Sequence, residues 1–270
     1  MTGGITILFL LENMCFLHYN RMADPLSQWM KEKKMALKMI FFDLDGTLLP
    51  MDQDAFIQHY FRSLSAHLAP HGYEPHSLMQ GVQAGIGAMI ANTGEKRNEE
   101  VFWDTFCAFL GRDARKDIPL FEDYYHRHFI AAKAACGCNP RAAECIAWLK
   151  KKGFRLALAT NPFFPALATL QRIQWAGLNP DDFEIITTYE NSRHCKPNPE
   201  YYRDLIRELD VDPRECLMAG NDALEDLVAE TTGMKVFLLT EWLLNKPGID
   251  ITSYPQGDFD DLIRYISSIE

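Results

Sequence analysis

The chain has 270 residues, of which 47% are hydrophobic, and it carries a formal net charge of −10. This is enough apolar material for one large core, or for a core with a smaller module. An acidic surface repels phosphate backbones, so the charge argues against nucleic acid as a partner. A small anion remains an acceptable substrate, because a local basic site can oppose the global field.

The first 34 residues differ from the rest of the chain. The run from Ile5 to Leu17 is apolar, but it contains Glu12 and Asn13 and is too short to span a bilayer. It also lacks the basic start and the cleavage site of a signal peptide. We therefore interpret residues 1–34 as an N-terminal extension that need not be structured, and we predict no membrane partner.

The cysteines indicate a reducing compartment. There are seven, an odd number, and their spacing is irregular in a large chain. Cys136 and Cys138 form a close pair, but no second pair follows at the spacing of a zinc site, so we expect ordinary thiols. The predicted location is the cytoplasm.

Beyond residue 36, short apolar runs alternate with helical patterns. The apolar runs are Leu37–Leu44, Phe154–Thr160, Phe183–Thr188, Glu215–Gly220 and Met234–Leu239. Helical patterns precede the second, fourth and fifth of these runs, at residues 141–153, 199–209 and 222–233. Runs of this length are typical of strands that are covered on both faces. The alternation predicts an α/β fold with a Rossmann-like parallel sheet and helices on both faces.

The segment from residue 51 to residue 135 breaks this alternation. It is rich in helix formers and aromatic residues and shows no pattern of a core strand. We predict an inserted all-helical domain at 51–135, which divides the core into residues 35–50 and 136–270. The histidines, most of which fall in this insertion, are interpreted as surface or packing residues.

Polar side chains follow four of the predicted strands, at the edge where open parallel sheets bind ligands. They are Asp43, Asp45, Thr160, Asn161, Lys196, Asp222 and Asp226. Two acids at the exit of a core strand are costly to bury unless a cation meets them. Carboxylate oxygens suit Mg²⁺, and Mg²⁺ with a lysine can neutralise a phosphoryl group during transfer. The pattern therefore predicts a phosphoryl-transfer site with Mg²⁺ as its cofactor.

In this order, these residues resemble the four motifs of the haloacid dehalogenase-like (HAD) hydrolase superfamily. The matching stretches are Asp-Leu-Asp-Gly-Thr at 43–47, Thr160, Lys196 and Gly-Asn-Asp-Ala-Leu-Glu-Asp at 220–226. The first motif is the most specific, and the other three gain weight from their order. The helical insertion directly after the first motif resembles the C1-type cap of the family, which closes over the active site.

The resemblance implies a role for each of these residues. Asp43 would attack phosphorus and form an aspartyl-phosphate, and Asp45 would protonate the leaving group and then activate water. The phosphoryl oxygens would be held by Thr160, with Asn161 beside it, and by Lys196.

The metal would bind Asp43 and the backbone carbonyl of Asp45, with Asp222 and Asp226 completing the site. The fourth motif can be aligned in two ways, with either Asn221 or Asp222 at the metal position. We prefer Asp222, because an anionic oxygen binds Mg²⁺ better than an amide does.

The resemblance implies a Mg²⁺-dependent phosphatase that acts on a small phosphorylated metabolite. A phosphomutase on the same core is the main alternative. A dehalogenase is disfavoured, because halide departure does not need the leaving-group acid that Asp45 supplies. A non-catalytic binding module would have lost Asp43 or Lys196, and both are present. Neither the substrate nor the oligomeric state follows from the sequence.

Overall fold

The computed structural model describes residues 36–269. The extension expected at residues 1–34 lies outside the described residues. Within residues 36–269, no helix is both long enough and apolar enough to cross a membrane. The six cysteines of this part of the chain carry free thiols.

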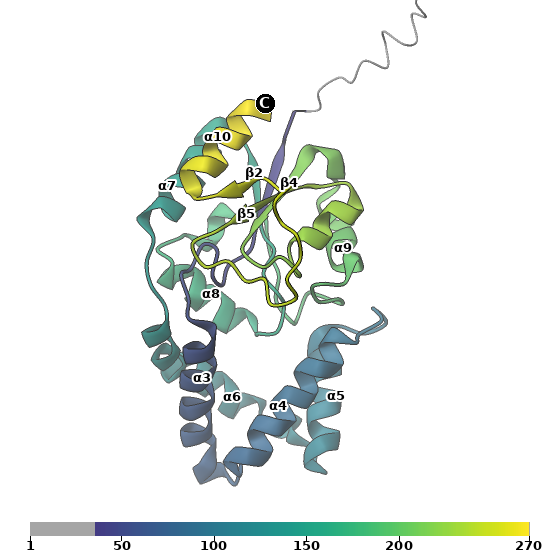
Figure 1. Cartoon of the computed structure of the whole chain (residues 1–270). Helices are drawn as coiled ribbons and strands as arrows, with labels where there is room; N and C mark the ends of the chain where they lie inside the picture. The colour runs from purple at the N-terminus through teal and green to yellow at the C-terminus, as the bar shows by residue number, and fades with distance from the viewer. Residues whose placement is uncertain (1–35, 270) are drawn as a thin grey trace, which may run out of the picture. The chain divides into compact units, whose positions relative to one another are not determined.

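The core is a parallel sheet with β1 at its centre (Figure 1). In the described residues its strand order is β3-β2-β1-β4-β5-β6, and every neighbouring pair is parallel. The strands are β1 Met39–Phe42, β2 Arg155–Leu158, β3 Ile185–Ile186, β4 Cys216–Gly220, β5 Lys235–Leu239 and β6 Gln256–Gly257. The first five confirm the predicted runs. The sixth was missed because two residues without an apolar run give no strand pattern.

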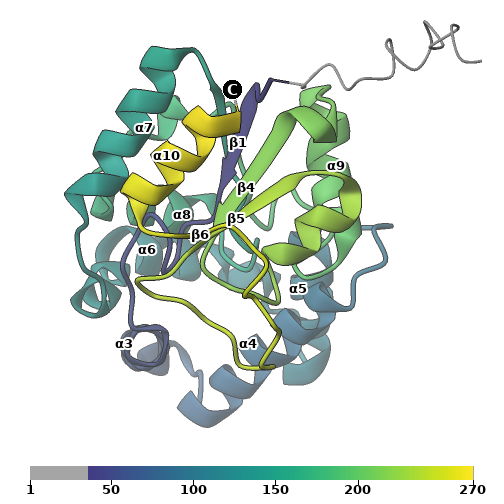
Figure 2. The ribbon, with the colours of Figure 1, turned by 45° about the horizontal axis from the view of Figure 1, so that its top comes forward.

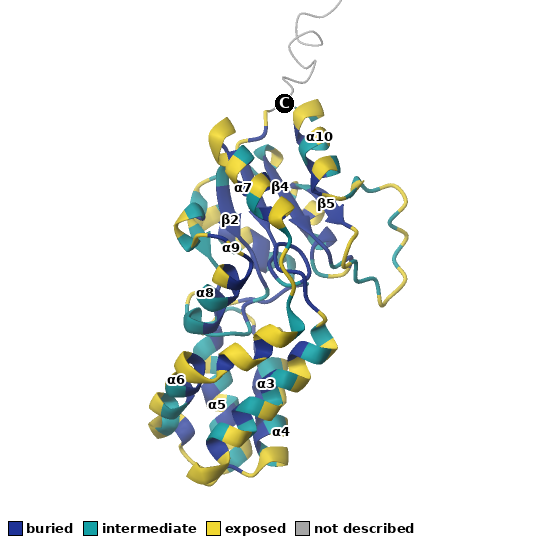
Figure 3. Cartoon of the chain, turned by 90° about the vertical axis from the view of Figure 1, so that its left-hand side faces the viewer, coloured by how far each residue is buried: buried dark blue, intermediate teal, exposed yellow. Residues whose placement is uncertain are grey.

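Helices cover both faces of the sheet (Figure 2). Alternate residues of a strand point to opposite faces, and in β1 the residues on both faces are apolar and buried. In β1, Ile40 and Phe42 pack in the cluster that holds α7, α8 and α10, whereas Met39 and Phe41 pack with α9 and η6. These elements are α7 Pro140–Lys152, α8 Ala166–Trp175, α9 Pro199–Leu209, η6 Leu227–Thr232 and α10 Phe259–Ile269. Figure 3 shows the result, with buried strands between helices whose outer faces are exposed.

Two of the predicted helices form, and the third does not. The helix α7 begins after the cap residue Asn139 and ends at Lys152, where it is capped by Gly153 with a φ of +87°. The helix predicted over 222–233 is instead a turn followed by the six-residue 3₁₀-helix η6. The Asp222 carboxylate accepts the backbone N–H groups of Leu224 and Glu225 in this turn, and the Asp226 side chain pairs with Lys196 of a distant segment.

Residues 53–135 form helices joined by turns. They are α3 Gln53–Leu68, η1 Ala69–His71, α4 Pro75–Ile90, α5 Asn98–Leu110, η2 Ala114–Asp117, α6 Ile118–Arg127 and η3 Phe129–Ala135. Their aromatic residues pack together, as Trp103 and Phe106 pack edge-on against Phe121 at 5.3 and 5.8 Å between ring centroids, and they belong to the same buried cluster as Ile40 and Phe42 of β1. Figure 1 shows this helical insertion on the side of the core toward which β1 runs.

The chain enters and leaves the insertion at neighbouring points. The backbone N–H of Asp52 donates to the carbonyl of Ala135 at 3.0 Å, and that of Gly137 donates to the carbonyl of Pro50 at 2.8 Å. A further contact joins the start of α5 to the core, where the N–H of Asn98 donates to the Ser192 carbonyl at 2.9 Å. The insertion is thus hydrogen-bonded to the segment that leads into Lys196.

Candidate active site

The side chains of Asp43, Lys196 and Asp226 form a buried chain of ion pairs just beyond β1. Lys196 Nζ donates to Asp43 Oδ1 at 2.9 Å and to Asp226 Oδ1 at 2.7 Å. The Lys196 side chain is 0% exposed. Burial opposes its charge, but Asp226 and Asp43 outweigh this effect and hold the pKa of Lys196 well above its ordinary value. The lysine is therefore charged and fixed beside Asp43.

Thr47 and Asn221 hold the other side of Asp43. Thr47 Oγ1 lies 3.2 Å from Asp43 Oδ2 and 2.8 Å from Asn221 Oδ1, and Asn221 Nδ2 donates to the carbonyl of Trp242 at 2.7 Å. Gly46 makes this close approach possible. Its φ is +83°, and a Cβ there would lie 2.3 Å from Asn221 Nδ2. The glycine and threonine of the first motif thus orient the acid that precedes them.

Asp45 forms an ion pair with Arg172 of α8. The Arg172 side chain is 1% exposed, and its guanidinium carbon lies 4.6 Å from the ring centroid of Phe164. Burial raises the pKa of Asp45, and the charge of Arg172 acts in the opposite direction. Asp45 Oδ1 is buried and has no hydrogen-bond partner among the described residues. One oxygen of this acid is therefore held by Arg172, and the other has no hydrogen-bond partner among the described residues.

Sequence reasoning missed Arg172. The available signal was a charged residue inside the apolar helical pattern Ala-Leu-Ala-Thr-Leu-Gln-Arg-Ile-Gln-Trp, where Ala168 and Ile173 on either side are fully buried. An arginine at such a position needs a partner acid.

The fourth motif folds around the carboxylate of Asp226. Asp226 Oδ2 accepts the backbone N–H of Asp222 at 2.9 Å, and a Cβ on Gly220 would lie 2.0 Å from that same oxygen. Both oxygens of Asp226 are therefore occupied. Asp222 Oδ2 accepts no hydrogen bond from the described residues, whereas Asp222 Oδ1 accepts two from the backbone.

A cavity of about 340 Å³ opens above these groups. Its polar side is lined by Asp43, Asp45, Thr160, Asn161, Asn221, Asp222 and Glu225. Asn161 Oδ1 is buried without a partner among the described residues. Lys196 and Asp226 do not line the cavity and lie behind Asp43. The structure thus brings the predicted residues to one site, five of them facing the cavity and two supporting it.

The charges of the site suit a divalent cation. The charged groups are Asp43, Asp45, Asp222, Asp226, Lys196 and Arg172. Four carboxylates against two cations leave an excess of negative charge at the place where a phosphate would bind, which a hard cation would offset. Asp43, the free oxygen of Asp222 and the Asp45 carbonyl are oxygen donors of the kind that Mg²⁺ prefers. The residues present therefore fit the predicted metal.

Glu225 is a second residue that sequence reasoning missed. It lines the cavity, and burial raises its pKa to about 8, so its carboxyl group is mainly protonated at neutral pH. It lies inside the Asn-Asp-Ala-Leu-Glu-Asp run, where it read as one more acid of a helix start.

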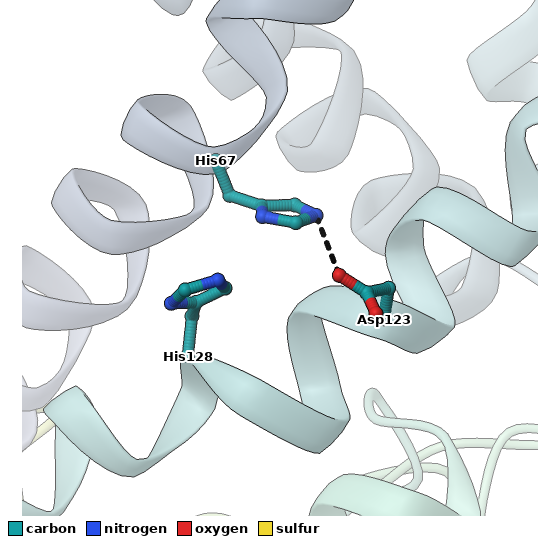
Figure 4. A group of neighbouring side chains, drawn as sticks. All are labelled: His67, Asp123 and His128. Carbon is teal, nitrogen blue, oxygen red and sulfur yellow. Dashed lines mark ion pairs between the residues drawn. The ribbon is translucent and has the colours of Figure 1, made fainter.

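A separate group of possible metal ligands lies in the insertion (Figure 4). His67, Asp123 and His128 each offer a ligand atom within 4.8 Å of the others, and none of them lines the cavity. His67 Nε2 is already 3.1 Å from the Leu120 carbonyl, and Asp123 pairs with Arg127 at 2.8 Å. We assign this group no catalytic role.

Comparison with known proteins identifies the family of this chain. A family model described as haloacid dehalogenase-like hydrolase matches residues 37–229. Pyrophosphatase PpaX from Bacillus mycoides (strain KBAB4) is 22% identical over 237 residues, which cover 87% of this chain and 99% of that protein.

Two solved structures share the fold. The HAD phosphatase from Thermococcus onnurineus has a TM-score of 0.52 at 20% identity and covers 85% of this chain and 98% of its own. The L-2-haloacid dehalogenase from Xanthobacter autotrophicus was solved with chloropropionic acid covalently bound. It has a TM-score of 0.51 at 16% identity, and the match covers 87% of this chain and 100% of that chain. With a family match over more than half of its length, this chain belongs to the haloacid dehalogenase-like hydrolases.

Proposed function

We propose that this protein is a Mg²⁺-dependent phosphatase that hydrolyses a small phosphate monoester through an aspartyl-phosphate on Asp43. The observation that carries the proposal is the setting of Asp43. One of its oxygens accepts from buried Lys196 and the other from Thr47, and it faces a cavity beside a second acid, Asp45. A fixed carboxylate nucleophile next to an acid–base group is what a two-step phosphoryl transfer needs.

In the first step, a carboxylate oxygen of Asp43 forms a bond to phosphorus while the bond from phosphorus to the leaving-group oxygen breaks. The proton on Asp45 moves to that oxygen, so that an alcohol departs. In the second step, Asp45 takes a proton from a water molecule that attacks phosphorus. Phosphate leaves, and Asp43 and the proton on Asp45 are restored.

The remaining predicted residues would bind and orient the phosphoryl group. Thr160 and Asn161 face the cavity from the end of β2, and Lys196 places a positive charge behind Asp43. When bound, Mg²⁺ would neutralise charge on the phosphoryl oxygens. It would be held by Asp43, Asp222 and the Asp45 carbonyl, and we assign Asp226 the role of positioning Lys196 and the Asp222 backbone.

We further propose that residues 51–135 act as a cap over a core formed by residues 35–50 and 136–270. Two observations support this. The chain crosses between the two parts at neighbouring points, next to Pro50 and Gly137, and the cavity takes residues from both parts, such as Tyr60 from α3 and Asp43 from the core. A cap of this kind excludes water from the site when it closes.

Two features favour phosphatase chemistry. The relative from Bacillus mycoides is named a pyrophosphatase, which is a phosphorus hydrolase. Asp45, held by Arg172 with one free oxygen, supplies the proton that an alkoxide leaving group needs and a halide does not.

The experiment is a screen of phosphorylated metabolites for phosphate release, with Mg²⁺ and with a chelator. We expect release from some esters with Mg²⁺ and none with the chelator. Asp43→Asn should release none, while Asp181→Asn, an exposed acid outside the cavity, should behave like the wild type. Equal activity of the Asp43→Asn variant would contradict the proposal, and transfer to a second site of the substrate without net phosphate release would indicate a phosphomutase.

A further inference from the structure

The cavity above Asp43 has a second wall whose chemistry differs from the first. The helix α3 supplies Phe56, Ile57, Tyr60 and Phe61, α4 supplies Ile86, and the segment after β2 supplies Phe163. These side chains are hydrocarbon or aromatic. The leaving group of a phosphate ester bound at Asp43 would have to lie against this wall, because the phosphoryl group occupies the polar side.

The aromatic part of this wall is held in place by its own packing. Tyr60 and Phe164 pack edge-on with ring centroids 5.4 Å apart, and Phe56 packs against Phe164 at 6.1 Å. The Tyr60 hydroxyl lies 3.1 Å from that of Tyr125, so its polar end already has a partner. The ring rather than the hydroxyl is therefore what Tyr60 offers to a ligand.

The lining contains no cation. None of the described residues that line the cavity is Lys, Arg or His. The two cations beneath it are committed, Lys196 to Asp43 and Asp226, and Arg172 to Asp45. Lys96 and Arg97 of the insertion do not line the cavity. Lys96 pairs with Asp104 at 2.7 Å, and Arg97 donates to the Glu190 carbonyl at 2.6 Å.

A leaving group with its own negative charge would therefore have no partner here. A carboxylate or a second phosphate would lose its hydration against an apolar wall and face the carboxylate of Asp222. The neutral polar groups on this side are the amides of Gln53 and Gln83, which can bind a hydroxyl, carbonyl or amide of a ligand.

We propose that the substrate is a phosphate monoester whose leaving group is uncharged and largely apolar, an aromatic or branched aliphatic alcohol rather than a hydroxy acid or a second phosphate. The inference rests on the proposed function. It concerns selectivity, which the apolar wall sets, and leaves the chemistry of Asp43 unchanged.

The test compares two esters of the same shape that differ in charge, 4-carbamoylphenyl phosphate and 4-carboxyphenyl phosphate, with inorganic pyrophosphate as a third substrate. We expect the wild type to show a kcat/KM for the carbamoyl ester at least about 10-fold above that for the carboxylate ester. The kcat/KM for pyrophosphate should also be lower than that for the carbamoyl ester.

A matched pair of variants ties this preference to the wall. Ile57 is 49% exposed and lines the cavity, and Ile90 of α4 is 48% exposed and lies outside it. Ile57→Lys places a cation in the wall and should reduce the preference for the carbamoyl ester by about 10-fold or more. Ile90→Lys makes the same change on the same insertion and should leave the preference as in the wild type.

Three outcomes overturn the inference. The first is an equal kcat/KM for the two esters, or a higher kcat/KM for the carboxylate ester or for pyrophosphate. If Asp43→Asn abolishes that activity, the phosphatase function stays intact. The same shift in Ile57→Lys and Ile90→Lys would show that the wall does not set selectivity. If the wild type hydrolyses none of the three substrates and no member of a metabolite panel, both the proposed function and this inference are overturned.

Discussion

The two walls of the cavity above Asp43 are built in different ways. The polar wall comes from the ends of β1, β2 and β4, and its side chains are fixed by ion pairs and hydrogen bonds, such as those of Lys196 and Thr47. The apolar wall comes mainly from α3 and α4 of the insertion, and its side chains are held by packing, as with Tyr60 and Phe164. On the proposed function, reaction type would depend on one part of the chain and selectivity on the other.

This difference predicts two classes of variant. A change in the polar wall should affect turnover of every ester, because it alters groups that act on the phosphoryl group itself. A change in the apolar wall should affect some esters more than others, because it alters contacts with the leaving group.

The largest effect is expected for Asp43→Asn. It removes the attacking oxygen, and we expect turnover of all esters to fall by on the order of 10⁴-fold or more. The melting temperature should change little by comparison, because the amide oxygen can still accept from Lys196, which keeps Asp226 as its ion-pair partner, while the amide NH₂ can donate to Thr47 Oγ1. The checks are steady-state kinetics and circular dichroism. Near-normal turnover in a folded variant would refute covalent catalysis by Asp43.

The next effect concerns the metal and the two alignments of the fourth motif. Asp222→Ala removes a carboxylate that faces the cavity with a free oxygen, so its activity should require much more Mg²⁺. Asn221→Ala should require much less additional Mg²⁺, and Asp226→Ala should be intermediate, because Asp226 acts through Lys196 and the Asp222 backbone. The measurement is activity against Mg²⁺ concentration.

A reversed order would contradict this assignment. If Asn221→Ala needed the most Mg²⁺ and Asp222→Ala behaved like the wild type, the metal position in the fourth motif would be one residue earlier.

Arg172 links the polar wall to the fold of the core. Arg172→Met leaves Asp45 without its partner and should cost about 3 kcal/mol of unfolding free energy, since breaking a buried pair strands a charge. Burial raises the pKa of Asp45, and the charge of Arg172 lowers it. Loss of Arg172 should therefore raise the pKa of Asp45 further and move the pH–rate profile to higher pH.

Chemical denaturation and a pH profile check both parts of this prediction. Arg172→Lys keeps the charge and should recover much of the pH profile even if stability is only partly restored. A profile that is the same in Arg172→Met and in the wild type would show that the pair has a structural role alone.

The smallest effect is expected in the apolar wall. Phe61→Ala removes a ring that lines the cavity, and kcat/KM for an aromatic ester should fall by about 10-fold while that for a short aliphatic ester changes less. The Mg²⁺ requirement should stay as in the wild type. Equal losses for both esters would show that the two walls are not independent.

The sequence predicts the polar wall well because its signals are local. Asp43, Thr160 and Asp222 each follow an apolar run, and parallel strands bring such residues to one edge. The helix predicted over 222–233 was wrong, since this segment is a turn followed by η6, and the pairing of Asp226 with Lys196, 30 residues away, is not revealed by periodicity.

The apolar wall was not predictable in the same way. Phe56, Ile57 and Phe61 read as parts of an amphipathic helix, and nothing in their spacing says which of them faces a cavity. Arg172 was missed for a related reason, because its partner Asp45 is 127 residues away in sequence. Such contacts depend on how distant segments pack together.

The central claim is that Asp43 carries the phosphoryl group and that Asp45 then activates water. Asp45→Asn with 4-nitrophenyl phosphate separates the two steps, because 4-nitrophenolate leaves without being protonated whereas the water step still needs the base. After acid quench, we predict release of one 4-nitrophenolate per enzyme molecule and one phosphoryl group on the peptide that contains Asp43. Continued turnover by this variant with no phosphoryl group on that peptide at any quench time would contradict the account.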